Sequence, residues 1–322
     1  MTLAAPVAPD RDLLEPVVCC WVCGAARLER FHEFRFDFHE YQKQDPELHA
    51  YTGRTAWLVR CVSCGFGQPE AMPTLPRFFD RMYDQRWSED WVERELESSY
   101  KDLIFRTILR ELNRRVPATR HAGRHLLDIG AHAGRFMHLA QESGWRVEGI
   151  ELNPRTAACA ARRTGAPVHQ VNARVLVSDD RRFEAITLTD VLEHIPEPVG
   201  LLTTLSKLVA PGGAIAIKVP CGRSQWHKER FVSAIRPSHE VSLAGNLVHV
   251  NHFTPGSLTM ALERAGFRHV LVRTAAPELP PDRTGPQRLA SNALRMGVYV
   301  AARFPGGVHT PLALNLQAYA ER

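Results

Sequence analysis

The stretch from His125 to Gly144 constrains the fold of this chain more than any other. It reads HLLDIGAHAGRFMHLAQESG, which is an apolar run, a glycine-containing turn and then apolar residues at helical spacing. This order predicts a strand, a tight turn at Gly130 and Gly134, and an amphipathic helix. We expect it to open a Rossmann-like unit.

Further strands and helices alternate along the chain after this unit. The pattern predicts strands and helices in turn, with strands over 146–152, 168–171, 185–189 and 214–219 and helices over 153–163 and 198–209. Such alternation is typical of a doubly wound α/β fold, in which a mainly parallel sheet is covered on both faces. We assign this domain to residues 121–322.

Two cysteine pairs of identical spacing lie near the N-terminus, Cys20 with Cys23 and Cys61 with Cys64. A two-residue gap followed by glycine lets both thiolates of one turn face one ion, so the four sulfurs predict a structural, tetrahedral zinc site. Cys19 could replace Cys20 as a ligand. Free or redox-active thiols are the alternative, although redox CxxC motifs normally occur singly.

The cysteine pairs define a small module at the start of the chain. We expect a flexible N-terminus over 1–16 and a zinc ribbon over 17–75, which ends where glycines and prolines follow the second pair. Residues 77–116 contain neither glycine nor proline and carry apolar residues at helical spacing. The segment 76–120 therefore predicts two helices that form a linker or lid.

Composition limits the class of protein. Hydrophobic residues make up 44% of the chain, which is enough for a core, and no apolar run reaches the roughly 18 residues of a membrane span. The chain starts without the basic and apolar regions of a signal peptide, so we expect a cytoplasmic protein without a membrane partner. The net charge of +5 comes from scattered basic residues, so a nucleic-acid partner is not indicated.

The glycine turn distinguishes between two kinds of ligand. A dinucleotide site would have GxGxxG, whereas the turn here reads Gly130-Ala-His132-Ala-Gly134. Asp128 would repel a pyrophosphate but attract the sulfonium and ammonium groups of S-adenosylmethionine. Glu151, at the end of the second strand, can accept hydrogen bonds from ribose hydroxyls. Taken singly, each residue is better explained as a turn glycine, a helix cap or a surface acid; together they favour S-adenosylmethionine.

Several segments in order resemble class I S-adenosylmethionine-dependent methyltransferases. The first is LLDIGAHAGRF; Asp190-Val-Leu-Glu193-His194-Ile is similar to the segment after the fourth strand, LVAPGG to the turn before the fifth, and LERAGF to the last helix. The likeness covers residues 100–275. It implies a seven-stranded sheet whose final strand, 313–321, runs antiparallel to the rest.

The resemblance also implies which residues bind the methyl donor. Carried onto this sequence, they are Asp128, Gly130, His132, Gly134, Phe136, Glu151, Leu152, Asn172, Ala173, Thr189 and Asp190. The sequence departs from the family at three positions. His132 replaces the usual second glycine, Asn172 replaces an acid that commonly contacts the adenine, and Glu184 replaces an aspartate before the fourth strand.

The cysteine ribbon followed by helices resembles bacterial methyltransferases of sugar, polysaccharide and secondary-metabolite pathways. We therefore expect methyl transfer to an oxygen of a small-molecule acceptor, in preference to nitrogen or carbon. A histidine in or near the insertion at 221–253 is the expected base, with His249 ranked first and His252, His239 and His194 after it. The alternative is that these histidines only brace the loop.

Two other functions fit the same sequence. One is an RNA methyltransferase whose zinc ribbon holds RNA, although the chain has no basic run with interleaved aromatic residues. The other is a non-catalytic, donor-binding interaction module, which His132 in the glycine position keeps open. The sequence does not indicate the acceptor molecule or the oligomeric state.

Overall fold

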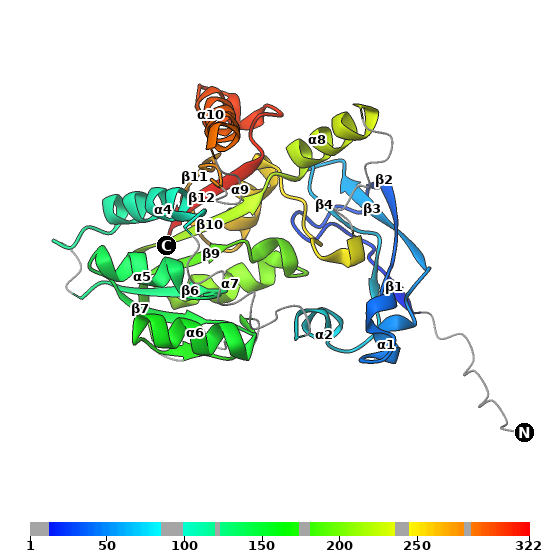
Figure 1. Cartoon of the computed structure of the whole chain (residues 1–322), viewed down its shortest axis with the longest axis horizontal. Helices are drawn as coiled ribbons and strands as arrows, with labels where there is room; N and C mark the ends of the chain where they lie inside the picture. The colour runs from blue at the N-terminus through cyan, green and yellow to red at the C-terminus, as the bar shows by residue number, and fades with distance from the viewer. Residues whose placement is uncertain (1–12, 85–98, 120–122, 174–180, 236–244, 280–284) are drawn as a thin grey trace, which may run out of the picture.

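The computed structural model describes residues 13–84, 99–119, 123–173, 181–235, 245–279 and 285–322. Figure 1 shows a large sheet with its helices beside a smaller β-ribbon formed by the N-terminal residues. No helix among these residues is long and apolar enough to cross a lipid bilayer.

The large sheet has seven strands in the order β11-β12-β10-β9-β6-β7-β8. They are β6 (His125–Ile129), β7 (Arg146–Ile150), β8 (Val168–His169), β9 (Phe183–Thr189), β10 (Val209–Pro220), β11 (Arg268–Thr274) and β12 (Asn315–Glu321). β12 pairs antiparallel with both β10 and β11, whereas the pairs from β10 to β8 are parallel. The expected Rossmann-like, mainly parallel sheet is confirmed.

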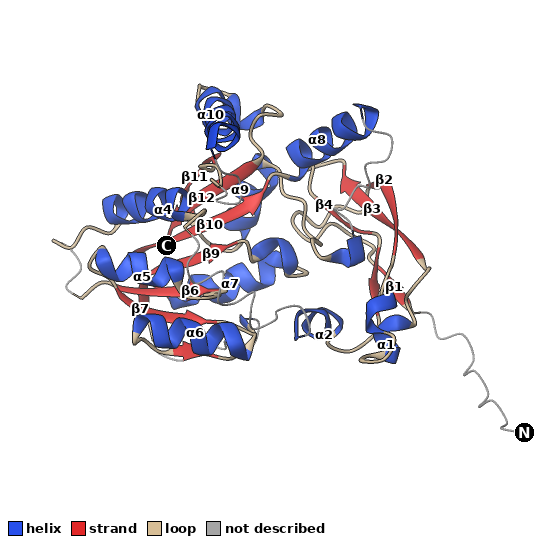
Figure 2. Ribbon diagram, in the orientation of Figure 1, coloured by secondary structure: helices blue, strands red, loops and turns tan. Residues whose placement is uncertain are grey.

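Helices cover both faces of this sheet (Figure 2). Ile215 and Ile217 of β10 pack toward α7 (Pro198–Leu208) and α9 (Pro255–Arg264), while Ala214 and Ala216 pack toward α4 (Asp102–Arg115) and α5 (Arg135–Glu142). α6 (Pro154–Thr164) lies against α5. Since successive side chains of a strand point to opposite faces, the apolar strands of this sheet build two cores.

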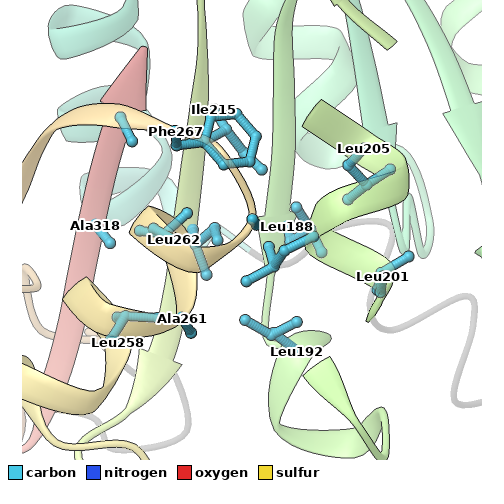
Figure 3. Close-up of a cluster of buried hydrophobic side chains, with 14 of the residues drawn as sticks. Leu188, Leu192, Leu201, Leu205, Ile215, Leu258, Ala261, Leu262, Phe267 and Ala318 are labelled. Carbon is cyan, nitrogen blue, oxygen red and sulfur yellow. The ribbon is translucent and has the colours of Figure 1, made fainter. Parts of the chain in front are cut away.

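The core on the α7 and α9 side is almost entirely apolar. Figure 3 shows Leu188 of β9 between Leu201 and Leu205 of α7 and Leu262 of α9. Burial of these side chains away from water is the main favourable term that holds the two helices on the sheet.

Capping residues in the sequence mark the starts of α6 and α9. The Asn153 side chain accepts hydrogen bonds from the amides of Arg155 and Thr156, Pro154 occupies the first turn, and Gly165 ends the helix in the left-handed conformation. An Asn cap satisfies amides that have no partner within the helix. α9 starts in the same way, with a capping box between Thr254 and Ser257.

The ribbon contains a three-stranded antiparallel sheet of β2 (Leu28–Arg35), β3 (Thr55–Cys61) and β4 (Gly67–Pro69). A second pair joins β1 (Leu14–Pro16) to β5 (Ala71–Pro73). Residues 1–12 lie outside the described part of the chain. The end of the segment expected to be flexible is instead a strand, because its backbone pairs with β5.

Phenylalanines form a separate core inside the ribbon. Phe34, Phe36 and Phe38 are buried together with Tyr51, between η1 (His39–Tyr41), α1 (Pro46–His49) and the sheet. α2 (Phe78–Asp84) belongs to this core, since the Phe78 ring lies 5.3 Å from the Tyr51 ring. The helical segment expected between the two parts therefore divides, with α2 on the ribbon and α4 on the large sheet.

The ribbon is attached to the large domain by backbone and aromatic contacts. Gly67 and His252 exchange backbone hydrogen bonds of 3.0 and 2.9 Å, and the rings of Phe66 and Phe253 are 5.1 Å apart. A Cβ atom on Gly67 would lie 2.9 Å from the Cβ of His252, so a glycine is required for this approach.

Two longer helices were not expected from the sequence. α8 (Gly222–Ile235) follows β10 and extends toward the ribbon in Figure 1, and α10 (Gly285–Ala302) lies beside the edge of the sheet formed by β11. Short 3-10 turns complete the described elements: η3 (Leu192–His194), η4 (Gly245–Leu247) and η5 (Gly307–His309).

Candidate functional site

A cavity of about 450 Å³ opens at the carboxyl ends of β6, β7 and β9. Ligands of open α/β sheets bind at this edge. Tyr100 and Lys101, which precede α4, cover one side of the cavity, and Val248 and His249 reach it from the loop before α9.

The glycine turn after β6 forms the floor of this cavity. Gly130 has φ +75°, and a Cβ atom on it would lie 2.3 Å from the Val191 side chain. Gly134 also has φ +75°, and its added Cβ would lie 2.8 Å from the Cα of Ala160 in α6. Gly130 is thus required where the turn meets the end of β9, and Gly134 where α5 meets α6.

Glu151 stands at the end of β7 and faces the cavity. Its two carboxylate oxygens accept hydrogen bonds from the backbone amides of His132 and Asn153, at 2.8 and 3.0 Å. Burial raises the pKa of Glu151, while these amides act in the opposite direction. The carboxylate is therefore held in place before any ligand arrives.

Asp128, at the end of β6, is nearly inaccessible to solvent. Burial raises its pKa to about 7, although a 2.7 Å hydrogen bond donated by the Thr187 hydroxyl acts against the shift. Because both Asp128 and Glu151 carry negative charge when ionised, this end of the cavity suits a cationic group.

His132 adopts a backbone conformation that favours glycine, with φ +50°. Histidine is tolerated there more often than most side chains. Burial and the charge of Lys101 lower the pKa of its imidazole to about 4, so the ring is neutral at pH 7. Histidine in place of the family's glycine therefore adds a ring to the cavity wall, and the backbone keeps the left-handed conformation of the turn.

Asp190, directly after β9, is an ion-pair partner rather than an open carboxylate. Lys218 of β10 and Lys101 both donate to it, the latter at 2.8 Å. Burial acts to raise the pKa of Asp190, but the two lysine charges outweigh it and the pKa falls. This pairing ties β9, β10 and the start of α4 together at the cavity.

Ten of the eleven residues expected to bind the donor line the cavity. They are Asp128, Gly130, His132, Phe136, Glu151, Leu152, Asn172, Ala173, Thr189 and Asp190. Gly134 does not line it, because that glycine faces α6.

The four expected histidines are placed differently. His194 and His249 both line the cavity, with ring centroids 4.8 Å apart. His252 is not among the lining residues: its backbone pairs with Gly67, and its ring packs beside Trp226 of α8 at a centroid distance of 5.7 Å. His239 lies outside the described residues.

Glu193 is the group next to these histidines that sequence reasoning left without a role. Glu193 is 1% exposed, and its Oε2 atom has no hydrogen-bond partner among the described residues. Burial and the charge of Asp190 raise its pKa to about 7.

Lys101 and Lys218 were also missed. Lys218 had a signal in the sequence, since it is the one charged residue in the apolar strand Ala214–Val219. A lysine in such a strand is buried and needs an acidic partner. Lys101 had no comparable signal.

The four cysteines come together in a second site, in the ribbon. The Sγ atoms of Cys20 and Cys64 are 3.6 Å apart, and those of Cys23 and Cys61 are 3.4 Å apart. The hydrogen bond with Cys64 lowers the pKa of Cys20 to about 5 and raises that of Cys64. Cys19 is exposed and is not part of the cluster.

Comparison with known proteins bears on the large domain. Residues 100–272, more than half of the chain, match the family model described as a methyltransferase domain. A solved S-adenosylmethionine-dependent methyltransferase from Mesorhizobium loti superimposes with a TM-score of 0.48 and 18% identity, over 70% of this chain and 100% of that one.

Curated relatives match a shorter part. A ubiquinone biosynthesis O-methyltransferase of Alkalilimnicola ehrlichii is 32% identical over 101 residues, which is 29% of this chain and 40% of that protein. A protein of the same name from Coxiella burnetii is 26% identical over 98 residues, or 29% of this chain and 42% of the relative. The chain thus spans about two fifths of the length of these relatives.

The ion pairs of Asp190 lead to a prediction about stability. Lys218→Met should lower the free energy of unfolding by about 3 kcal/mol, because it leaves a buried carboxylate with one lysine instead of two. Urea denaturation followed by circular dichroism measures this change.

The double variant Lys218→Met, Asp190→Asn should not recover the loss, since Lys101 then loses its carboxylate partner as well. Lys207→Met, on the exposed side of α7, is the matched control and should change stability by less than about 0.5 kcal/mol. Equal stability of the two lysine variants would contradict the structural role given to Lys218.

Proposed function

Since this chain belongs to the methyltransferase-domain family, we propose that it is an S-adenosylmethionine-dependent methyltransferase that methylates an oxygen atom of a small-molecule acceptor. The observation that carries the proposal is the position of His194 and His249, which lie together at the cavity that Gly130 and Glu151 also line. Imidazoles beside the donor site suit an acceptor whose hydroxyl must lose a proton.

For the donor, the proposal rests on the charges at the ends of β6 and β7. Glu151 is held by two backbone amides with its carboxylate at the cavity wall, where it can accept hydrogen bonds from the ribose hydroxyls. Asp128 and the backbone of the glycine turn lie beside it. The amino-acid end of the donor, which carries the cationic groups, fits this acidic region.

Replacement of Glu151 should therefore weaken donor binding. Glu151→Ala removes charge-assisted hydrogen bonds, so the binding free energy should become less favourable by roughly 1.5 to 3 kcal/mol in calorimetric titrations with S-adenosylmethionine. Glu142→Ala, on the exposed end of α5, is the control and should bind normally. Unchanged binding in Glu151→Ala would contradict this assignment.

For the acceptor, we propose that His249 takes the hydroxyl proton. As the O–H bond breaks toward the imidazole, the oxygen forms a bond to the methyl carbon and the C–S electrons return to sulfur. Burial lowers the pKa of His249, although the charge of Glu193 acts against that shift, so the ring is neutral near pH 7 and able to accept a proton. His194 is the second candidate from the same wall.

His249→Ala should lower turnover by roughly 10² to 10⁴ while donor affinity stays nearly constant. The measurement uses labelled S-adenosylmethionine with a panel of hydroxyl acceptors, and calorimetry for the donor. His227→Ala, exposed on α8, is the matched control. Normal turnover in His249→Ala, or an equal loss of donor binding, would remove His249 from this role.

The class of acceptor follows from similarity alone. The curated relatives carry the name of an O-methyltransferase of ubiquinone biosynthesis, which supports oxygen over nitrogen or carbon. The cysteine ribbon resembles that of bacterial sugar and secondary-metabolite methyltransferases. We therefore propose a sugar, a glycan or a secondary metabolite as the acceptor.

The ribbon is proposed to hold one structural zinc ion. Four thiolates at about 2.3 Å from zinc in a tetrahedron lie about 3.8 Å from one another, close to the 3.6 and 3.4 Å found between the paired Sγ atoms. All four positions come from the protein, which is typical of structural rather than catalytic zinc.

Protein purified without chelator should contain one zinc ion per chain, and Cys61→Ser should lose it. Metal analysis by mass spectrometry tests both statements. Cys19→Ser is the matched control, because Cys19 is exposed and outside the cluster, so it should retain the ion. Wild-type protein without zinc, or loss of zinc in Cys19→Ser, would contradict the proposed ligand set.

A further inference from the structure

Three potential metal ligands meet at the wall of the cavity. Glu193, His194 and His249 each offer one ligand atom, and these atoms lie within 4.8 Å of one another. Neighbouring ligands around an ion at 2.1 Å are separated by roughly 3 to 3.5 Å, so a shift of about an ångström in the side chains brings all three onto one ion. A carboxylate with two imidazoles is a recurrent donor set for divalent cations with open coordination positions.

The Glu193 carboxylate points to a ligand that the described residues do not supply. The residue is 1% exposed, and its Oε2 atom has no hydrogen-bond partner among the described residues. A buried carboxylate oxygen without a partner is costly, and a cation beside it removes that cost.

A hydrogen bond to the backbone fixes the tautomer of His194. Its Nδ1 atom lies within hydrogen-bond distance of the Val248 carbonyl oxygen. Because a carbonyl oxygen only accepts, Nδ1 carries the proton and Nε2 carries the lone pair. Metal-binding histidines are commonly fixed in this way, by a hydrogen bond from the second ring nitrogen to a carbonyl.

The segments that carry the three ligands are fixed to each other. The Glu193 carbonyl oxygen accepts from the amides of Val250 and Asn251, at 2.9 and 3.0 Å. The Asn251 side chain donates to the carbonyls of Leu192 and Ile195. His249 is thus held beside η3 by the residues that follow it, so the cluster is preorganised rather than a chance contact of mobile side chains.

From these observations we infer that Glu193, His194 and His249 form a binding site for a divalent cation. The ion has open coordination positions toward the cavity, where the acceptor's oxygen can bind. This role rests on the proposed function, whereas the site itself does not.

A cation at this position changes how the acceptor is activated. It lowers the pKa of a hydroxyl bound to it, so that the proton passes to solvent water. The oxygen then forms the bond to the methyl carbon, the C–S bond breaks, and its electron pair remains on sulfur. His249 serves as a ligand in this form and as the base only when the cation is absent.

Manganese is a suitable probe, because Mn²⁺ favours oxygen and nitrogen ligands and does not compete for the four thiolates of the ribbon. The full-length protein, with its ribbon metal content checked beforehand, is titrated with MnCl2, and the signal of free Mn²⁺ is followed by electron paramagnetic resonance. We expect one Mn²⁺ bound per chain. Failure of the wild-type protein to bind Mn²⁺ at millimolar concentration would overturn the inference.

Variants then locate the site. Glu193→Gln, which keeps the shape of the side chain, and His249→Ala should each weaken Mn²⁺ binding about 100-fold. His138→Ala removes a histidine that also has a glutamate nearby, Glu142 at 3.4 Å on the solvent-facing side of α5, and should bind Mn²⁺ as the wild type does. Equal affinity of all four proteins would place the ion elsewhere and overturn the assignment.

Two further readouts separate this inference from the proposed function. Calorimetric binding of S-adenosylhomocysteine shows that each variant is folded at the donor site. Site-specific Mn²⁺ binding without methylation of any hydroxyl acceptor would overturn the proposed function but leave the cation site standing. Full turnover of metal-depleted protein, with no response to Mn²⁺, would overturn the role of the cation in the reaction.

Discussion

The two hydrogen bonds from Val250 and Asn251 to the carbonyl oxygen of Glu193 hold the cavity and the ribbon together. They fix the segment before α9 against η3, and η3 is itself the continuation of β9 in the centre of the sheet. One residue further along, His252 exchanges two backbone hydrogen bonds with Gly67 of the ribbon. Residues 248–252 therefore reach the cavity at their start and pair with the ribbon at their end.

The ribbon also shares a hydrophobic core with the large domain. Cys20 and Cys61 are buried in the same apolar cluster as Phe253 and Leu258. The turns of the ribbon that carry these cysteines are thus part of the core that covers the α7 and α9 face of the sheet. The loop with His249 lies between these turns and the cavity. Folding of the ribbon and positioning of His249 depend on a common set of contacts.

The sequence was sufficient for the features that repeat along the chain or follow from a local motif. Alternating apolar runs predicted the strands of the sheet, and the glycine turn with Glu151 at the end of the next strand predicted the cavity wall. These inferences succeed because strand order and right-handed crossovers leave few arrangements for such a pattern. The cysteine spacing predicted that Cys20, Cys23, Cys61 and Cys64 lie together, because two such pairs complete one tetrahedral site.

Features that depend on distant contacts were not predictable in this way. His249 and His252 are three residues apart and look equivalent in the sequence, yet only His249 reaches the cavity, because pairing with Gly67 directs His252 toward Trp226. Lys101 and Lys218 meet at Asp190 from separate elements, and only the fold shows that they share a partner. The short backbone bridge between Gly67 and His252 also makes the two halves of the molecule thermodynamically reciprocal. Any change in the cavity's affinity for a ligand that metal binding at the four cysteines produces must be matched by an equal change in metal affinity when that ligand is bound.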